Sequence, residues 1–243
     1  MLIRDLANPY RFLALARALV PAFAILAALL LGLGLVLGFR APADYQQGET
    51  VRIMYVHVPA AWMALGTWVL MAASALGTLV WRHPLADVSA KAAAPIGAAF
   101  CLICLVTGAL WGRPMWGAYW VWDARLTSVL VLFLLYLGVL ALWRAIDDQN
   151  RAARAAAVLT LVGLVNIPII KFSVDWWSTL HQPASVFRLS GSTIHPALLT
   201  PLFVMALGFA ALFLALYLAA MRNEILRRRV RTAHILAATR AER

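Results

Sequence analysis

Charged residues are scarce in this chain of 243 residues. Asp, Glu, Lys and Arg together make up 13% of it, against about 25% in an average soluble domain. Apolar residues make up 64%, and the mean hydropathy is +0.83. This composition excludes a disordered chain, a coiled coil and an ordinary soluble domain. The sequence therefore predicts an all-α, polytopic integral membrane protein.

Six apolar stretches are long enough to cross a bilayer, since a span needs about 20 mainly apolar residues. They run over residues 18–39, 58–81, 92–110, 126–143, 155–172 and 197–221. The first follows several arginines and could be a signal peptide, but its apolar run exceeds the roughly 7–15 residues of a signal sequence. We interpret it as a retained first span, and we expect one six-helix membrane domain over residues 1–243.

Acidic residues are also few: 10 Asp and Glu stand against 21 Lys and Arg, which gives a net charge of +11. Fifteen of the 21 lie before the first span, in the loops 82–91 and 144–154, and after the last span. The other six are Arg40, Arg52, Arg113, Arg125, Lys171 and Arg188. Basic residues accumulate on the cytoplasmic side of membrane proteins. We therefore expect both termini in the cytoplasm, outer loops over about 40–57, 111–125 and 173–196, and no nucleic-acid partner.

The segment after the last span, about 222–243, forms a basic cytoplasmic tail that contains Arg227, Arg228, Arg229 and Arg231. Such a run is typical of the charges that fix the orientation of a span. It could also bind anionic lipid headgroups or a cytoplasmic partner.

Cysteine occurs only twice, as Cys101 and Cys104 near the middle of the third span. The outer loops contain none, which excludes a structural disulfide or a thiol–disulfide catalyst on that side. Leu105 follows the pair, so the haem-attachment motif C-x-x-C-H is absent, and no second ligand pair at zinc-finger spacing is present. We expect two small apolar residues that pack on one helical face.

The second outer loop is rich in aromatic residues. It contains Trp111, Trp116, Tyr119, Trp120 and Trp122, with Gly112 and Gly117 among them and Asp123 and Arg125 after them. If the segment is helical, Trp116 and Trp120 share a face. Tryptophan favours the membrane interface, and an aromatic belt explains one or two per span end. Four in one short loop, followed by charged residues, are better explained by a platform for a large, flat, amphipathic ligand.

Histidines occur in the two other outer loops. His57 precedes Pro59, so we expect it at the outer mouth of the second span, because proline favours the first helical position. His181 follows the sequence DWWSTL, which is similar to a surface helix that lies on the bilayer and ends near His181. His195, at the mouth of the sixth span, competes as a ligand on chemical grounds. His83 and His234 are expected to be solvated on the cytoplasmic side.

Haem suits this combination of residues, because its iron takes axial imidazoles and its ring needs an apolar aromatic slot. Its propionates need cations, and guanidinium matches carboxylate geometry. The available partners are Arg52, Arg113, Arg125 and Arg188. Asp123 is expected to orient Arg125 or the loop backbone, since the ring already carries two carboxylates.

The sequence WGRPMWGAYWVWDARLTS resembles the WWD signature of the haem-handling proteins of cytochrome c biogenesis. The segments IMYVHVPAAW and NIPIIKFSVDWWSTLHQP resemble the histidine loops of one branch of that family. This branch is CcmC, the haem-handling protein C of the bacterial cytochrome c maturation (Ccm) system. The resemblance covers nearly the whole chain, including the six spans and the length.

The resemblance implies that His57 and His181 are the axial ligands of haem b, with Trp116, Trp120, Trp122 and Asp123 at the haem edge. It implies a bacterial inner-membrane protein that presents haem at the periplasmic face and transfers it to the haem chaperone, protein E. The ABC transporter proteins A and B and the small protein D would be further partners. It further implies a role in haem transfer more than in enzymatic catalysis. His195 is not part of the family pattern.

Three alternative functions make different predictions. A membrane redox protein usually carries axial histidines inside its spans, whereas the centres of these spans have none. A transporter needs polar groups near the midplane, and the spans offer little beyond Ser74, Thr107 and Asn166. A structural subunit of an ABC transporter complex would purify without haem and would tolerate substitution of His57 and His181.

Overall fold

A computed structural model describes residues 8–183, 185–188 and 191–241. The terminal Arg4 and Arg243, which count towards the charge bias, lie outside these ranges. Within them the regular elements are helical, apart from an isolated β-bridge between Asp44 and Gly48. The helices are α2 (Pro9–Arg40), the 3₁₀ helix η1 (Glu49–Ile53), α3 (Met54–Leu79), α4 (Ala86–Trp116), α5 (Ala124–Ala145), α6 (Gln149–Gly163), α7 (Asn166–Trp176) and α8 (Pro196–Ala241).

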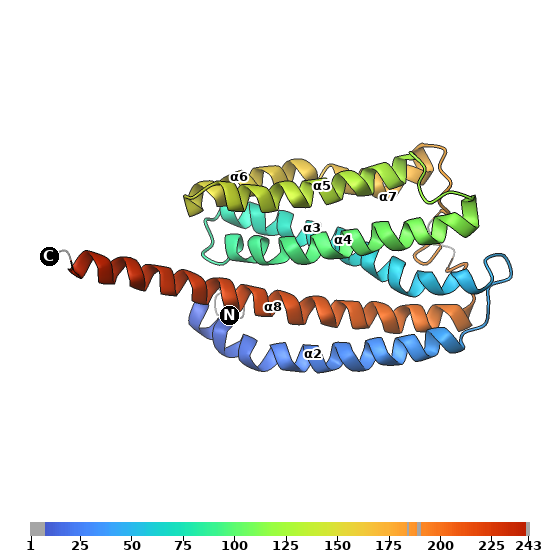
Figure 1. The fold of residues 1–243 in the computed structure, drawn as a ribbon, viewed down its shortest axis with the longest axis horizontal. Helices are drawn as coiled ribbons and strands as arrows, with labels where there is room; N and C mark the ends of the chain where they lie inside the picture. Colours follow the sequence, from blue (N-terminus) through green and yellow to red (C-terminus); the bar gives the residue numbers. More distant parts are fainter. Residues whose placement is uncertain (1–7, 184, 189–190, 242–243) are drawn as a thin grey trace.

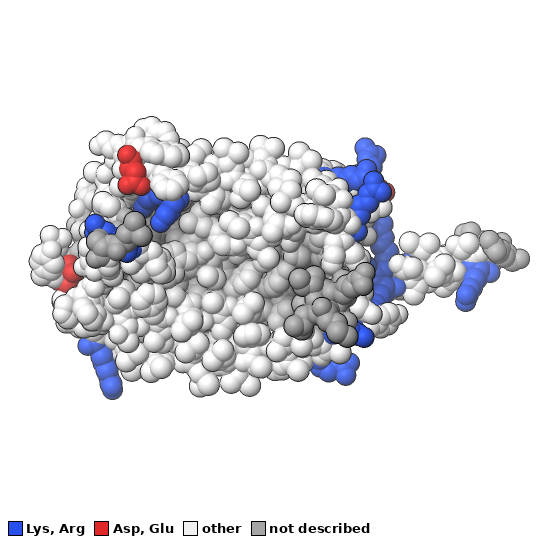
Figure 2. Space-filling model, turned by 180° about the vertical axis from the view of Figure 1, so that it is seen from behind, with Lys and Arg blue, Asp and Glu red and all other residues white. Residues whose placement is uncertain are grey.

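The described residues form six helical segments that are long and apolar enough to cross a membrane. They are α2, η1 with α3, α4, α5, α6 with α7, and α8, which confirms the predicted number and order of spans. Figure 1 shows them as long rods joined at two opposite ends of a bundle. Lys and Arg gather at these ends and leave an uncharged belt between them (Figure 2). The all-α membrane fold is thus as predicted.

The centre of the bundle is organised by two buried rings. Trp68 of α3 and Tyr136 of α5 are both 0% exposed and meet edge to face, with 4.7 Å between ring centroids. Their polar atoms are satisfied by backbone carbonyls: Trp68 Nε1 donates to Thr160 O at 3.2 Å, and Tyr136 Oη donates to Ala64 O at 2.7 Å. In lipid such groups find no water, so these bonds fix α3, α5 and α6 against one another.

The first apolar stretch is an integral part of the packing, because α2 lies along α8 over much of its length (Figure 1). Two glycines make this close approach possible. A Cβ at Gly34 would lie 2.5 Å from Met205 Sδ, and a Cβ at Gly208 would lie 2.8 Å from Leu31 Cδ2. Small residues at the contact therefore determine where the two helices meet.

The fifth span is broken, which the sequence did not predict. α6 ends at Gly163 and α7 begins at Asn166. Tight bonds close the turn between them, from Leu164 N to Leu161 O at 3.2 Å and from Val165 N to Val162 O at 3.3 Å. Asn166 then donates to the Ser128 carbonyl at 2.8 Å, so the polar side chain is satisfied inside the bundle.

Two predicted helix boundaries at the loop-rich end are wrong. α3 begins at Met54, so Pro59 lies inside the helix and His57 is on its first turn instead of before it. α7 ends at Trp176, and residues 177–183 are not helical, so the expected surface helix before His181 does not form. At the opposite end α8 continues as a helix well beyond the bundle (Figure 1).

Candidate functional site

The candidate site lies where the connections 41–53, 117–123 and 177–195 meet the C-terminal turns of α4. These connections contain or flank the histidines and aromatic residues singled out in the sequence. The structure brings the predicted residues into two groups, one around His57 and one around His181.

His57 projects from the first turn of α3 towards α4. Its Nδ1 lies 3.1 Å from both the Cys104 carbonyl oxygen and Thr107 Oγ1. Thr107 Oγ1 itself donates to Ile103 O at 2.6 Å, which holds the hydroxyl in place. The ring has room only because residue 108 is glycine, since a Cβ there would lie 2.9 Å from His57 Cε1. The imidazole is therefore fixed against one turn of a neighbouring helix.

Trp111 completes the His57 group. Its ring meets the imidazole edge to face, with 5.6 Å between centroids. The indole Nε1 donates to Gln47 Oε1 at 2.9 Å. The first connection is thereby bound to α4 through Gln47, and Trp111 cannot rotate away without losing that bond.

His181 belongs to the second group, with Trp116 and Asp123. Its Nδ1 lies 3.4 Å from Asp123 Oδ2, and its ring centroid lies 4.8 Å from that of Trp116. Asp123 is the N-cap of α5 and accepts from Leu126 N at 2.7 Å through its other oxygen. It therefore caps α5 and also holds His181, and the contact with His181 was not predicted.

Burial lowers the pKa of His181 below its ordinary value. The carboxylate of Asp123 acts in the opposite direction, and the nearby Arg125 lowers the pKa further. The net effect keeps the imidazole neutral at physiological pH, which is the form that can bind a metal.

The end of α4 is shaped by two glycines. Gly117 adopts φ = 78° as the left-handed cap that ends the helix, a conformation that favours glycine. A Cβ at Gly112 would lie 2.9 Å from Trp116 Cε3, so only glycine lets this ring fold back over the helix. Because α4 ends at Trp116, Trp116 and Trp120 do not share a helical face. Trp120 instead packs edge to face on Trp122, with 5.4 Å between centroids.

The four predicted arginines differ in how many contacts their side chains already make. Arg125 is committed to α7, donating to Ser173 Oγ at 3.0 Å and to the Lys171 carbonyl at 3.3 Å. Arg52 pairs with Glu49 and donates to the Ala41 carbonyl at 3.4 Å. Arg113 bonds to the Gly117 carbonyl and lies over the ring of Tyr119, and its side chain is exposed. Arg188 is exposed in the third connection.

Several buried polar atoms at this end of the bundle have no hydrogen-bond partner among the described residues. They are Arg52 Nε, Tyr55 Oη, Trp120 Nε1 and Thr179 Oγ1. Each is a donor, and an unmade bond of a buried donor destabilises the fold by about 1–3 kcal/mol. Unpaired donors grouped in one region are typical of a site that receives acceptors from a ligand.

The other histidines and the two cysteine thiols have different surroundings, and Cys104 contributes its backbone carbonyl to the His57 group. His195 accepts from Ala197 N at 3.2 Å and caps α8, so it has a structural role. His83 accepts from Leu85 N, and His234 is exposed in the extension of α8. Cys101 and Cys104 are buried and free, as expected. Among the described residues no cluster of His, Cys, Asp and Glu could hold a bare metal ion.

The sequence interpretation missed residues that position the predicted ones. Gln47, Thr107 and Gly108 contact Trp111 or His57, and Tyr55 and Thr179 contribute unpaired donors. A lone threonine followed by glycine inside an apolar span was the available signal for Thr107 and Gly108. No comparable signal marks Gln47, since its partner is distant in sequence.

Comparison of the sequence with known proteins finds relatives over nearly the whole chain. The family model described as CcmC, heme exporter protein C, matches residues 2–236. Heme exporter protein C of Bradyrhizobium diazoefficiens is 65% identical over 240 residues, which cover 99% of this chain and 91% of that protein. Heme exporter protein C of Escherichia coli K12 is 49% identical over 225 residues, which cover 92% and 91%. The chain belongs to the heme exporter protein C family.

Proposed function

We propose that this protein binds haem at the loop-rich end of the bundle and transfers it to a haem chaperone during cytochrome c maturation. His57 and His181 serve as the two axial ligands. The observation that carries the proposal is the convergence of these two imidazoles, from distant parts of the chain, on the last turns of α4. The names of the relatives support haem as the ligand.

Both imidazoles have the hydrogen-bond pattern of a ring that carries its proton on Nδ1. In each ring the hydrogen bonds recorded among the described residues are made by Nδ1, to a carbonyl and a hydroxyl for His57 and to a carboxylate for His181. An acceptor at Nδ1 places the proton there and leaves the lone pair on Nε2. Such outer partners orient a metal-binding histidine and raise its basicity. These two Nε2 atoms would hold the haem iron.

The residues around the histidines fit an amphipathic ring. Trp111 and Trp116 flank His57 and His181 and offer apolar faces. The unpaired donors Tyr55 Oη, Trp120 Nε1 and Thr179 Oγ1 could be satisfied by carboxylate oxygens. We infer that the propionates are received by these donors together with Arg52, Arg113 or Arg188. Arg125 has a different role, because its guanidinium already binds α7.

The exposed aromatic residues are suited to the transfer of haem to a partner protein. Tyr119 is 58% exposed and Trp122 is 75% exposed, so both can contact a partner as well as a bound ring. We propose that this rim meets the haem chaperone, protein E of the Ccm system. The ABC transporter proteins A and B and the small protein D would act in the same system.

The proposed location is the bacterial inner membrane, with the haem-binding loops in the periplasm and both chain ends in the cytoplasm. Most of the basic residues lie at the bundle end where α8 extends past the other helices and where the 144–154 turn lies. The positive-inside rule assigns that end to the cytoplasm. Residues 1–243 would then form one membrane domain whose outer end carries the site. The ligand would be haem b, as the family resemblance implies.

The decisive experiment is the absorption spectrum of the full chain, purified in detergent and loaded with haem. We expect the spectrum of a bis-imidazole haem, which changes on His57→Ala or His181→Ala and disappears in the double variant. His234→Ala is the matched control, because His234 is exposed on the extension of α8. A double variant that kept the full bis-imidazole spectrum would overturn the ligand assignment.

Transfer is tested separately by mixing the loaded protein with purified chaperone and measuring haem covalently bound to the chaperone. The wild-type chain should donate haem, and the double variant should not. A different result would indicate a structural subunit of a transporter complex. In that case the chain would purify without haem, and substitution of both histidines would leave the amount of haem bound to the chaperone unchanged.

A further inference from the structure

The opposite end of the bundle contains a second polar site. A pocket opens between the start of α4, the turn from α5 to α6, and α8 where it leaves the bundle. Its basic lining residues are Lys91, Arg144, Arg227, Arg228 and Arg231, against Asp147 and Glu224 as acidic ones. Figure 2 shows this concentration of Lys and Arg where the extension of α8 begins. The pocket therefore has an excess of positive charge.

Part of this positive charge is already neutralised. Glu224 is 7% exposed and binds Lys91 Nζ at 3.0 Å and Arg228 Nε at 2.9 Å, and it also pairs with Arg227. Arg228 makes a further ion pair with Asp87 at 2.7 Å. Glu224 thus holds the basic side chains of α4 and α8 together, although their like charges repel one another.

Two guanidinium groups of the pocket remain uncommitted. For Arg144 and Arg231, no ion pair or side-chain hydrogen bond to another described residue is recorded, and both side chains are exposed. They come from different elements, the end of α5 and the extension of α8. Guanidinium groups bind phosphate through paired hydrogen bonds, so these two can serve one anion.

Trp143 supplies an independent indication of a missing acceptor. It lines the same pocket, and its Nε1 is buried without a hydrogen-bond partner among the described residues. Lys91 Nζ lies over the indole ring, 4.5 Å from its centroid, and holds it in position. A buried indole N–H that points to no acceptor is rare in folded proteins, because most buried donors are paired.

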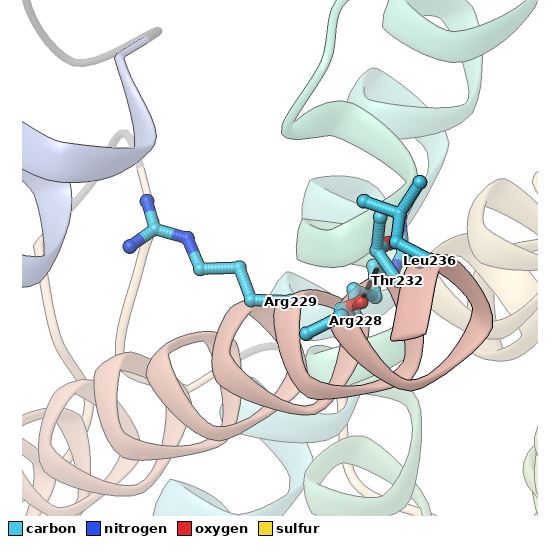
Figure 3. Close-up of a pocket in the computed structure, with 5 residues that line it drawn as sticks. Arg228, Arg229, Thr232 and Leu236 are labelled. Atoms are coloured by element: carbon cyan, nitrogen blue, oxygen red, sulfur yellow. Dashed lines mark hydrogen bonds between the residues drawn. The ribbon is translucent and has the colours of Figure 1, made fainter. Parts of the chain in front are cut away.

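The depth of the pocket identifies the class of ligand. Trp143 stands at the end of the uncharged belt, where the apolar residues of α5 give way to Arg144. Tryptophan favours the level of the lipid headgroups. The neighbouring arginines on α8 do not all face the pocket: Arg229 points away towards α2 (Figure 3), where its guanidinium lies 4.1 Å from the ring centroid of Tyr10. Arg144 and Arg231 thus line the pocket while Arg229 does not, and Trp143 indicates that the pocket lies at the level of the lipid headgroups.

We propose that this pocket binds the phosphate of an anionic phospholipid, with Arg144, Arg231 and the Trp143 N–H as its donors. The acyl chains would lie along the apolar belt of the bundle, and Glu224 would keep the basic residues together when no lipid is bound. The proposal is independent of the haem site, because the two lie at opposite ends of the bundle.

The test uses the full chain in detergent, titrated with phosphatidylglycerol and monitored by native mass spectrometry for bound lipid. We expect the double variant Arg144→Gln/Arg231→Gln to bind phosphatidylglycerol about tenfold more weakly than the wild type, since two charge-assisted bonds are lost. Trp143→Phe, which keeps a ring but removes the N–H, should weaken binding by less. Arg240→Gln is the control, because Arg240 lies far along the exposed tail.

Two further additions identify the ligand. Phosphatidylcholine should bind no better to the wild type than to the double variant, and millimolar inorganic phosphate should not displace phosphatidylglycerol. Equal binding of phosphatidylglycerol by the wild type and the double variant would overturn the proposal. Displacement by inorganic phosphate alone would overturn the assignment to a lipid.

Discussion

His57 and His181 are held by different kinds of structure. His57 stands on a helix, and both of its Nδ1 contacts belong to one turn of α4, inside a packed pair of helices. His181 stands in a non-helical connection, and its Nδ1 contact is a single carboxylate at 3.4 Å. A ligand on rigid elements is positioned more accurately than one on a loop. We therefore expect His57 to be the fixed ligand and His181 the one that is released when haem is transferred.

The largest effect should come from the fixed ligand. His57→Ala should weaken haem retention by more than about 100-fold, because loss of even an outer partner of a metal ligand costs about 10–100-fold. His181→Ala should cost less, and added imidazole should restore its spectrum, since a non-helical connection can move to admit a small molecule. If added imidazole restored the absorption spectrum of both variants equally, the proposal that His57 is fixed and His181 is released would be wrong.

Gly108 tests the packing around His57 alone. Gly108→Ala places a Cβ 2.9 Å from His57 Cε1, so the ring must shift, and we expect about tenfold weaker haem retention. Gly66→Ala is the matched control, because a Cβ at Gly66 of α3 meets nothing within 4 Å. Retention by the Gly108 variant equal to that of the control would show that His57 tolerates displacement.

Asp123 tests the support of His181 alone. Asp123→Asn keeps an oxygen that can cap α5, since asparagine and aspartate are equally good N-caps, but it removes the charge near His181. We expect haem retention to fall by up to about tenfold. Asp148→Asn, which alters the N-cap of α6 at the other end of the bundle, serves as the control. A similar loss in both variants would mean that helix capping explains the effect.

The exposed arginines should matter least for retention. Arg113→Gln and Arg188→Gln should each change the haem dissociation constant by no more than about fivefold, since exposed ion pairs contribute about 0–1 kcal/mol. A haem titration of each variant measures this. A much larger loss for one of them would identify it as a buried propionate partner in the loaded protein.

The stability of the haem-free protein should depend on pH through His181. Because the pKa of His181 is lowered, the stability linked to this group is present above the ordinary histidine pKa of about 6.5 and is lost as the pH falls below it. Asp123→Asn removes a cause that raises the pKa of His181, so the pKa should fall further. Titration of the His181 ring by NMR tests this, and an upward shift would contradict the proposed contact.

Composition and the lengths of the apolar runs predicted the all-α class and the six spans, because these depend on the membrane as a solvent. The break after Gly163 and the helical start at Met54 were not predictable, since they depend on contacts such as Asn166 with Ser128. The aromatic residues and histidines of the site were found from local density. Their partners Gln47 and Thr107 were not, because tertiary structure alone brings them to Trp111 and His57.

α8 is 46 residues long, which corresponds to about 69 Å at 1.5 Å per residue, more than twice the roughly 30 Å of a hydrocarbon core. It starts beside the connection that carries His181 and ends well beyond the other helices at the opposite end of the bundle. An α-helix hardly compresses along its axis. An axial displacement of its C-terminal end would therefore reach the third connection almost undiminished, so α8 couples the two ends of the bundle mechanically.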